Sequence, residues 1–153
     1  MAIEKTIFLK DLNETNSFGK KLSALLKPGD LIYLSGDLGS GKTTCVRAML
    51  QGLGFEGKVK SPTYSLFEQY EFDFTVNHFD LYRFKSPQEW EDAGFSEFIN
   101  TEDVTIIEWP EMAKGILPGP DLLLNFFHHD DLSRNMTISS LSKRGDECLQ
   151  YLS

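Results

Sequence analysis

Residues 36–43 of the sequence, GDLGSGKT, match the pattern G-x-x-x-x-G-K-[ST] of a phosphate-binding loop. In such a loop the backbone N–H groups surround the phosphates of a nucleotide at the start of a helix. We expect Lys42 to reach the β- and γ-phosphates and the Thr43 hydroxyl to bind Mg²⁺. Thr44 follows in the first helical turn, where it can bond the α-phosphate. The predicted nucleotide-binding residues of the loop are Gly36, Asp37, Leu38, Gly39, Ser40, Gly41, Lys42, Thr43 and Thr44.

Two acidic residues at predicted strand ends are candidates for the hydrolytic chemistry. Glu108 follows the apolar run 104–107, VTII, and we favour it as the metal-binding carboxylate beside Thr43. Asp80 ends the less apolar run 76–80, VNHFD, and we expect it to make a second metal contact or to polarise the attacking water. The reverse assignment of these two roles stays open. Either carboxylate has the further alternative of capping a strand end or pairing with Arg83.

Thr63 and Arg134 are two further candidates for the nucleotide site, and each also has a purely structural explanation. Thr63 lies after the predicted helix, where P-loop switch proteins place a threonine that senses the γ-phosphate through Mg²⁺. A proline turn leading into a strand explains the Ser-Pro-Thr segment 61–63 equally well. Arg134 could reach the phosphates as a cation of the same chain, or it pairs with a carboxylate at the surface. His128 and His129 lack the spacing of metal ligands and are predicted to lie in a solvated turn.

The phosphate-binding loop needs a buried strand before it and a helix after it, and the sequence predicts both. Residues 31–35, LIYLS, are a near-continuous apolar run bounded by turn residues, which is typical of a strand buried on both faces. Residues 43–53 show helical periodicity and end at glycines. The loop therefore lies between a strand and a helix, as its chemistry requires.

The rest of the pattern predicts an α/β fold. A strand at 5–9 precedes a helix that begins at Asp11 or Asn13 and carries apolar residues to Leu26. Further strands are predicted at 64–73, 75–82, 104–109, 121–127 and 135–141, with a helix starting in the capping-box segment 86–89 and a turn at 143–146. We expect one P-loop domain over residues 1–153, with a three-layer fold in which antiparallel strands are added to a parallel core, giving a mixed sheet.

Length, composition and charge narrow the class of protein. The chain has 153 residues, 41% of them hydrophobic, which is enough for one core. A net charge of −8 disfavours strong direct binding to nucleic acid, which needs a basic surface. No apolar run is long enough to span a bilayer and the first residues are charged, so we expect a cytoplasmic protein without membrane contact. Cys45 and Cys148 are predicted to be reduced thiols.

Two classes of nucleotide-dependent protein fit the sequence poorly. It has no Asn-Lys-x-Asp motif for reading guanine, so nothing favours a GTPase. A small-molecule kinase usually adds an arginine-bearing lid, and no arginine-rich segment follows the predicted core. The absence of a guanine-reading motif does not by itself establish specificity for adenine, and Mg²⁺ is the metal ion expected beside the phosphates.

Several motifs taken together resemble the TsaE family. They are GDLGSGKTT (36–44), VKSPTYSL (59–66), HFDLYRF (78–84) and IIEWPE (106–111), followed by Leu117 and Pro118 before a C-terminal hairpin. The resemblance runs in order from about residue 18 to residue 145. TsaE proteins are bacterial P-loop ATPases required for the threonylcarbamoyladenosine modification of transfer RNA. Ser40 stands where the family usually has alanine, a change that should not abolish phosphate binding.

The resemblance implies a regulatory ATPase that binds ATP and Mg²⁺ and acts with the TsaD–TsaB heterodimer. TsaD performs the transfer, and TsaE resets the complex by hydrolysis. By position, Lys42 and Thr43 match the family's nucleotide and metal residues, and Asp80 and Glu108 match its functional acids. The switch-like threonine, an aromatic beside the site and a basic nucleotide contact correspond to Thr63, Trp109 and Arg134. We expect the free protein to be a monomer that hydrolyses ATP slowly. An ATP-binding module without useful hydrolysis and a small-molecule kinase remain the alternatives.

Overall fold

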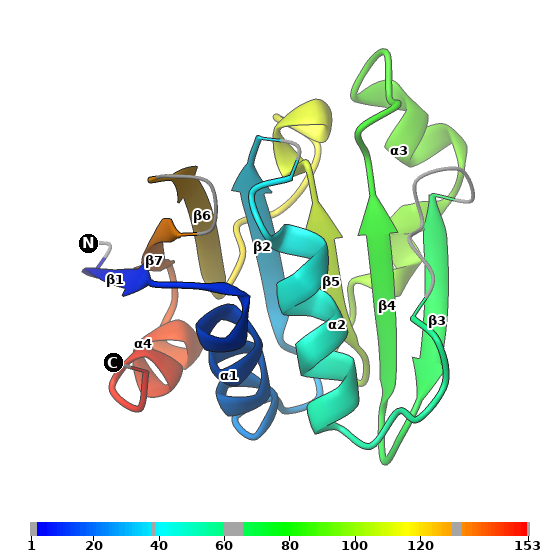
Figure 1. Cartoon of the computed structure of the whole chain (residues 1–153). Helices are drawn as coiled ribbons and strands as arrows, with labels where there is room; N and C mark the ends of the chain where they lie inside the picture. The colour runs from blue at the N-terminus through cyan, green and yellow to red at the C-terminus, as the bar shows by residue number, and fades with distance from the viewer. Residues whose placement is uncertain (1–2, 38, 60–65, 130–132, 153) are drawn as a thin grey trace.

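The computed structural model describes residues 3–37, 39–59, 66–129 and 133–152 (Figure 1). Its strands form one seven-stranded sheet in the order β1-β7-β6-β2-β5-β4-β3. The strands are β1 (Ile3–Leu9), β2 (Leu31–Gly36), β3 (Phe67–Glu71), β4 (Thr75–Asp80), β5 (Val104–Glu108), β6 (Leu122–His128) and β7 (Arg134–Ser140). The helices are α1 (Leu12–Ser23), α2 (Lys42–Gly52), α3 (Gln88–Asp92) and α4 (Lys143–Leu149), with 3₁₀ turns η1 (Phe95–Phe98) and η2 (Pro110–Ala113).

The centre of the sheet is parallel and its edges are antiparallel. Strand β2 runs parallel to both β5 and β6, and β4 runs parallel to β5. Strands β1 and β7 on one side, and β3 on the other, pair antiparallel with their neighbours. The predicted mixed sheet with a parallel core is therefore confirmed. Because β2, β5 and β4 run the same way, their carboxyl ends meet at one edge, the upper edge in Figure 1.

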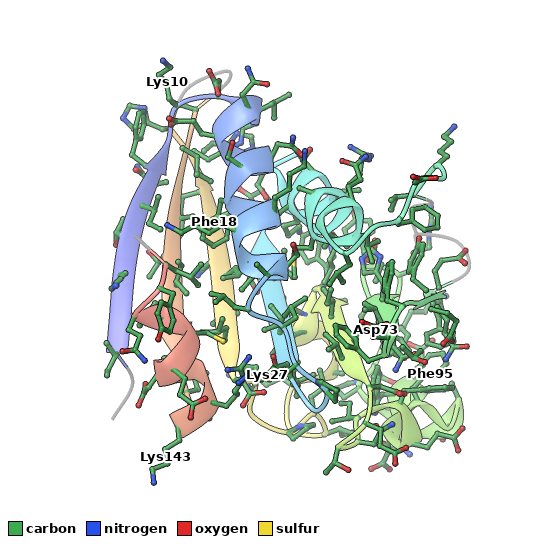
Figure 2. The ribbon with its side chains drawn as sticks, turned by 90° about the horizontal axis from the view of Figure 1, so that it is seen from below. Lys10, Phe18, Lys27, Asp73, Phe95 and Lys143 are labelled. Atoms are coloured by element: carbon green, nitrogen blue, oxygen red, sulfur yellow. The ribbon has the colours of Figure 1, made fainter. Side chains whose placement is uncertain are left out.

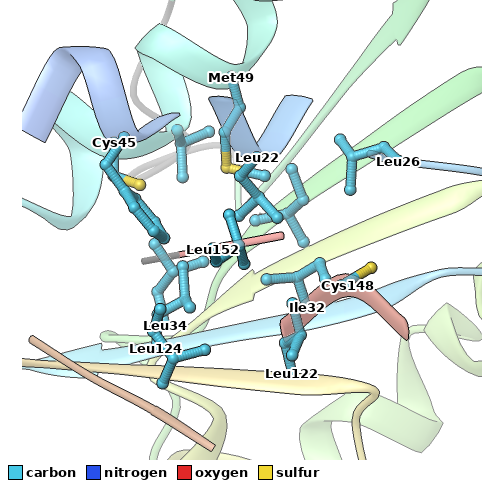
Figure 3. Packing of buried hydrophobic residues seen from close by; sticks show 14 of the residues in the cluster. Leu22, Leu26, Ile32, Leu34, Cys45, Met49, Leu122, Leu124, Cys148 and Leu152 are labelled. Atoms are coloured by element: carbon cyan, nitrogen blue, oxygen red, sulfur yellow. The ribbon is translucent and has the colours of Figure 1, made fainter. Parts of the chain in front are cut away.

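Helices α1, α2 and α4 cover one face of the sheet (Figure 1). Figure 3 shows apolar side chains of the helices, among them Leu22 and Met49, together with Leu152 after α4, packed against Ile32 and Leu124 of the strands. Phe18 likewise lies between α1 and the sheet in Figure 2, whereas Lys10 and Lys143 point outward. Burial of this apolar layer away from water is the main force that holds the helices on the sheet.

Helices α1 and α2 pack unusually closely because a glycine lies at their contact. A Cβ atom added to Gly19 would lie 2.6 Å from the Cβ of Ala48 and 2.7 Å from the carbonyl oxygen of Cys45. The side chain of Asp11 accepts a hydrogen bond from the Glu14 N–H and so caps α1. Of the two predicted caps, Asp11 is therefore the correct one. The helix ends at Ser23, so the apolar residue Leu26 lies beyond it.

The opposite face carries an aromatic cluster beneath α3, η1 and η2. Phe79 of β4 lies 4.9 Å from Trp90 of α3 and 5.0 Å from Phe95 of η1, between ring centroids. The predicted start of α3 is also seen, since Glu89 Oε2 accepts a hydrogen bond from the Ser86 N–H at 3.0 Å. This second layer covers β2, β5 and β4 from behind and completes the three-layer arrangement.

The predicted turn at 143–146 is wrong, because these residues begin α4. Ser142 caps the helix by accepting a hydrogen bond from the Gly145 N–H at 2.9 Å. Lys-Arg-Gly-Asp has the composition of a turn, but the cap and the burial of Cys148 and Leu149 in the helix-side core favour a helix. Glycine is required at 145 because a Cβ there would lie 2.1 Å from the Asp121 carbonyl oxygen.

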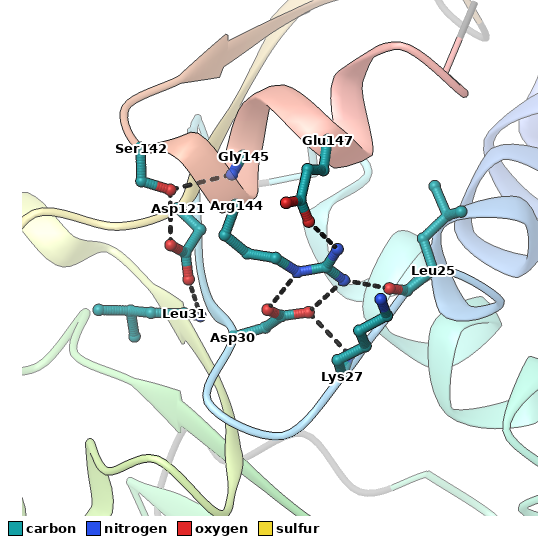
Figure 4. Close-up of polar contacts among 9 residues, drawn as sticks. All are labelled: Leu25, Lys27, Asp30, Leu31, Asp121, Ser142, Arg144, Gly145 and Glu147. Atoms are coloured by element: carbon teal, nitrogen blue, oxygen red, sulfur yellow. Dashed lines mark hydrogen bonds and ion pairs between the residues drawn. The ribbon is translucent and has the colours of Figure 1, made fainter.

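Helix α4 is anchored at the sheet edge opposite the carboxyl ends of the parallel strands (Figure 4). Arg144 Nε lies 2.8 Å from Asp30 Oδ1, and Asp30 is buried at the start of β2. Asp121 accepts a hydrogen bond from the Leu31 N–H at 2.8 Å and one from the Ser142 hydroxyl at 2.7 Å. In the part of the chain that the structure describes, no helix has the length and apolar character needed to cross a membrane.

Candidate functional site

The glycine-rich loop connects β2 to α2 at the carboxyl edge of the sheet. Gly36 has φ +139°, and a Cβ there would lie 2.6 Å from the Phe126 carbonyl oxygen, so only glycine fits. Gly41 has φ +108° and precedes the helix in the left-handed region. The Cys45 N–H donates to the Gly41 carbonyl at 2.9 Å. The N–H groups of the preceding residues, 42–44, therefore have no acceptor within the helix and form a positive helix end.

A cavity of about 160 Å³ lies in front of this helix end. It brings together most of the predicted site, because residues from the loop, α2, β4 and β5 line it. The lining residues are Leu12, Gly39, Gly41, Lys42, Thr43, Thr44, Asp80, Glu108 and Trp109. Gly36 and Asp37 line a neighbouring cavity instead, together with Glu111 and Trp109. Ser40 is buried within the loop, and Leu38 and Thr63 lie outside the described residues.

Lys42 is held between its own loop and an aromatic ring. Its Nζ donates a hydrogen bond to the Gly36 carbonyl oxygen and lies 3.8 Å from the centroid of the Trp109 ring. Trp109 has φ +59° at the end of β5, and Tyr82 packs against its ring at 4.9 Å. Burial lowers the pKa of Lys42, an effect opposed by nearby carboxylates, of which Glu108 has the largest influence.

Asp80 and Glu108 are neighbours across two parallel strands. They occupy paired register positions at the carboxyl ends of β4 and β5, and both side chains are buried. Asp80 Oδ1 accepts a hydrogen bond from the Tyr82 N–H at 2.9 Å. Glu108 Oε2 lies 2.6 Å from His78 Nε2. Asp80 is thus held by the backbone that follows β4, and Glu108 by a side chain of the neighbouring strand β4.

The residues around the cavity fit a magnesium ion bound together with phosphates. Thr43 supplies a hydroxyl oxygen, and Asp80 and Glu108 supply carboxylate oxygens, which are the hard donors that Mg²⁺ prefers. The described residues contain no group of three or more His, Cys, Asp or Glu side chains placed to hold a metal ion. One or two carboxylates with waters and substrate phosphates is the usual arrangement for Mg²⁺ in nucleotide sites.

Arg134 lies behind the loop and not at the surface. Its Nε donates to the Ser40 carbonyl at 3.0 Å, and Nη2 donates to the Gly39 carbonyl at 2.9 Å. Arg134 is 7% exposed, so it is a buried residue and not the surface residue that one of the two alternatives required. It does not line the cavity in front of α2. The guanidinium binds the loop's carbonyl groups and so ties the β6–β7 hairpin to the loop.

Two residues of the site were not predicted from the sequence. Leu12, half exposed at the start of α1, lines the cavity beside Thr44. His78 is fully buried and contacts Glu108. Alternation along β4 contains the signal for His78, since it lies two residues before Asp80 and therefore on the same face. No local signal places Leu12 at the cavity, because α1 is brought there by packing on α2.

The chain is similar in sequence to known proteins of one family. The family model for the threonylcarbamoyl adenosine biosynthesis protein TsaE matches residues 9–136. The chain belongs to the TsaE family. It is 40% identical to the tRNA threonylcarbamoyladenosine biosynthesis protein TsaE of Haemophilus influenzae, with 97% of each chain covered. It is 33% identical to TsaE of Bacillus subtilis, over 92% of this chain and 88% of the relative.

A solved structure agrees with the fold. The crystal structure of Bacillus subtilis YdiB superposes with a TM-score of 0.85 at 26% identity, covering 99% of this chain and 95% of that one. The matched family region contains the glycine-rich loop, Asp80, Glu108 and Arg134. The resemblance to TsaE predicted from the sequence motifs is therefore confirmed.

Proposed function

We propose that this TsaE-family chain binds and hydrolyses ATP in tRNA threonylcarbamoyladenosine biosynthesis, as a regulatory ATPase and not as the transferase. One observation carries the proposal: a single cavity gathers the helix end of the loop, Lys42, Thr43 and two buried carboxylates. These groups are the parts that phosphoryl transfer to water requires. The family supplies the pathway, and the cavity supports the chemistry.

Each group has a role in binding. The N–H groups at the start of α2 bind phosphate oxygens, with Thr44 at the α-phosphate. The Lys42 ammonium moves from the Gly36 carbonyl to the β- and γ-phosphates, since an anion there offers a stronger partner. Thr43 and Glu108 would hold Mg²⁺, which when bound neutralises negative charge on the β- and γ-phosphates. The loop residues 36–41 provide the surrounding backbone.

The proposed reaction is attack of water on the γ-phosphorus. Asp80 polarises the water and accepts its proton, the new P–O bond forms, and the bond to the bridging oxygen breaks to leave ADP and inorganic phosphate. Thr63 is proposed as the residue that senses the γ-phosphate. Because Asp80 and Glu108 are on neighbouring strands, one can serve the water while the other serves the metal.

Partner proteins are part of this proposal. Lys42 is the one cationic residue among the described residues that line the cavity. P-loop sites with few cations are slow until a partner completes them, so we propose slow hydrolysis by the free monomer and stimulation by the TsaD–TsaB heterodimer. The net charge of −8 suits a protein partner better than direct binding to RNA.

Phosphate release from ATP, measured with and without TsaD–TsaB, tests the proposal. We expect the partners to raise the rate. Asp80→Ala should lower it by about 100-fold or more while ATP still binds, the usual effect of losing a general base. Lys42→Ala should abolish binding. Lys143→Ala, an exposed change at the opposite edge of the sheet, is the matched control and should leave the rate unchanged.

Two outcomes would replace the proposal. Full function of the complex with Asp80→Ala and Glu108→Gln, but none with Lys42→Ala, would indicate an ATP-binding module without useful hydrolysis. Phosphate transfer to an acceptor other than water, with no response to TsaD–TsaB, would indicate a small-molecule kinase.

A further inference from the structure

We propose that His78 is a positioning residue that holds the Glu108 carboxylate at the phosphate-binding cavity and keeps it from pairing with Lys42. The inference rests on the proposed function, in which Glu108 binds Mg²⁺ beside Thr43. His78 itself does not line the cavity, so it acts through Glu108.

Strand geometry brings the two residues together. Phe79 and Ile107 pack in the aromatic layer behind the sheet. Side chains alternate along a strand, so the residues flanking them, His78, Asp80 and Glu108, point to the other face, toward α2. Strands β4 and β5 are neighbours in the sheet, and Asp80 is in register with Glu108. His78 therefore lies one step back from the cavity on the same face as both carboxylates.

The contact between His78 and Glu108 is short and buried. His78 Nε2 lies 2.6 Å from Glu108 Oε2, and the two side chains are 0% and 2% exposed. A carboxylate only accepts hydrogen bonds, so Nε2 is the donor. The hydrogen bond uses one carboxylate oxygen and leaves the second available to a metal ion. Carboxylates that bind metals are usually held in this way by a hydrogen-bonding partner behind them.

Fold stability alone does not account for a histidine at this position. Within the described part of the chain, Nδ1 of His78 is buried and has no hydrogen-bond partner. An unsatisfied buried polar atom costs stability, and an apolar side chain would avoid that cost. The polar contact that the buried ring does make is with Glu108, a residue at the cavity.

Lys42 is the competing partner for Glu108. It lies in the same cavity, and Glu108 is the carboxylate with the largest influence on its pKa. Despite this, Lys42 donates to the Gly36 carbonyl and Glu108 pairs with His78. A Glu108 side chain released from His78 would be drawn to the ammonium group. Such a pair would occupy a metal ligand and the phosphate-binding cation at the same time.

The test is the Mg²⁺ dependence of nucleotide binding, measured with a fluorescent ATP analogue and without any turnover. We expect His78→Leu to raise the Mg²⁺ concentration needed for half-maximal tightening by about tenfold or more, the usual cost of losing a residue behind a metal ligand. The affinity for the analogue in the presence of EDTA should fall less than the affinity in the presence of Mg²⁺. His78→Gln should restore most of the wild-type Mg²⁺ dependence, because its amide N–H can replace that of Nε2.

A matched control separates this effect from general destabilisation. Arg144→Leu also removes the hydrogen-bonding partner of a buried carboxylate, Asp30, but at the opposite edge of the sheet (Figure 4). It should lower the denaturation midpoint without changing the Mg²⁺ dependence. Equal Mg²⁺ dependence for His78→Leu and Arg144→Leu would overturn the inference. If His78→Leu does not fold, His78→Asn replaces it, and identical behaviour of the shorter Asn and of Gln would likewise overturn it.

Glu108→Gln distinguishes failure of the inference from failure of the proposed function. If Glu108→Gln leaves the Mg²⁺ dependence unchanged, Glu108 is not the metal ligand, and the proposed function must be revised together with the inference. If Glu108→Gln shifts it and His78→Leu does not, the inference alone is wrong. A variant that combines His78→Leu with Glu108→Gln should have the same Mg²⁺ dependence as Glu108→Gln alone, because His78 acts through that carboxylate.

Discussion

Arg134 supports the glycine-rich loop without lining the cavity in front of it. Its planar guanidinium donates to the carbonyl groups of Gly39 and Ser40 from the side of the loop away from the cavity. A third hydrogen bond, from Nη1 to the Ser133 carbonyl at 2.8 Å, fixes the group to its own hairpin. We infer that Arg134 keeps the loop's carbonyl groups turned away from the phosphates, which leaves the N–H groups to face them.

Arg134→Lys should therefore weaken both the loop and the binding of nucleotide. An ammonium group cannot reproduce the fork of a guanidinium, so at least one buried carbonyl loses its donor. We expect the free energy of unfolding to fall by about 1–3 kcal/mol, together with weaker binding of a fluorescent ATP analogue. Chemical denaturation and fluorescence titration measure the two effects.

Arg144→Lys is the matched control for that prediction. Arg144 also makes a forked contact, with both carboxylate oxygens of Asp30, but far from the cavity. Its replacement should lower stability and leave nucleotide affinity unchanged. If Arg134→Lys behaves in the same way as Arg144→Lys, Arg134 has only a structural role.

At the scale of elements, the contact between α1 and α2 decides where the start of α1 lies. Because Gly19 has no side chain, α1 can approach α2 so closely that an added Cβ atom would overlap Ala48 and the backbone at Cys45. The same packing places Leu12 at the cavity beside the first turn of α2. The lining of the cavity thus depends on the packing of α1 on α2 as well as on the loop.

Gly19→Val should force α1 and α2 apart. The added atoms meet backbone at a distance that cannot be relieved by rotation of a side chain. Overpacking of this kind costs about 1–3 kcal/mol, which chemical denaturation can measure. Ser17→Val, at an exposed position of the same helix, is the control for placing a valine on α1 and should change stability little, because serine and valine have similar helix propensities. Equal losses for the two variants would contradict the packing argument.

At the scale of the whole molecule, both cysteines are buried in the one core that joins α1, α2 and α4 to the sheet. Cys45 and Cys148 are free thiols and both belong to this helix-side core (Figure 3). Burial raises the pKa of Cys148, so less of its reactive thiolate is present at neutral pH. Their positions differ, because Cys148 lines a surface pocket beside Arg144, and Cys45 is on the buried side of α2.

The native protein should react slowly with thiol reagents, and its two cysteines should react in a fixed order. Cys148 is expected first, since local opening of α4 exposes it. Cys45 should react only after global unfolding. Its labelling rate should be lower than in the unfolded protein by about a thousandfold or more, given typical domain stabilities. Mass spectrometry of peptides after timed labelling measures both rates, with urea-unfolded protein as the reference. Simultaneous labelling would show that α4 does not open independently of the rest.

The elements near the site were predictable because their signals are local. The apolar run 31–35, the glycine-rich loop and the periodicity of 43–53 correctly predicted β2, the turn and α2. Asp80 and Glu108 were predicted at strand ends, and both lie there. The prediction for residues 143–146 was wrong because their local composition favours a turn. The helix that they begin depends on a cap and on contacts with residues far away in the sequence.

By itself, the sequence determined the family, the order of the strands and of the helices before α4, and the position of the glycine-rich loop. The family follows from the resemblance of several motifs, and the elements follow from the spacing and alternation of apolar and polar residues along the chain. Only the tertiary structure decided that His78 binds Glu108, that Arg134 is buried behind the loop and that Leu12 reaches the cavity. Each of these contacts joins segments far apart in the sequence, so it arises from strand register and helix packing, which no local pattern records.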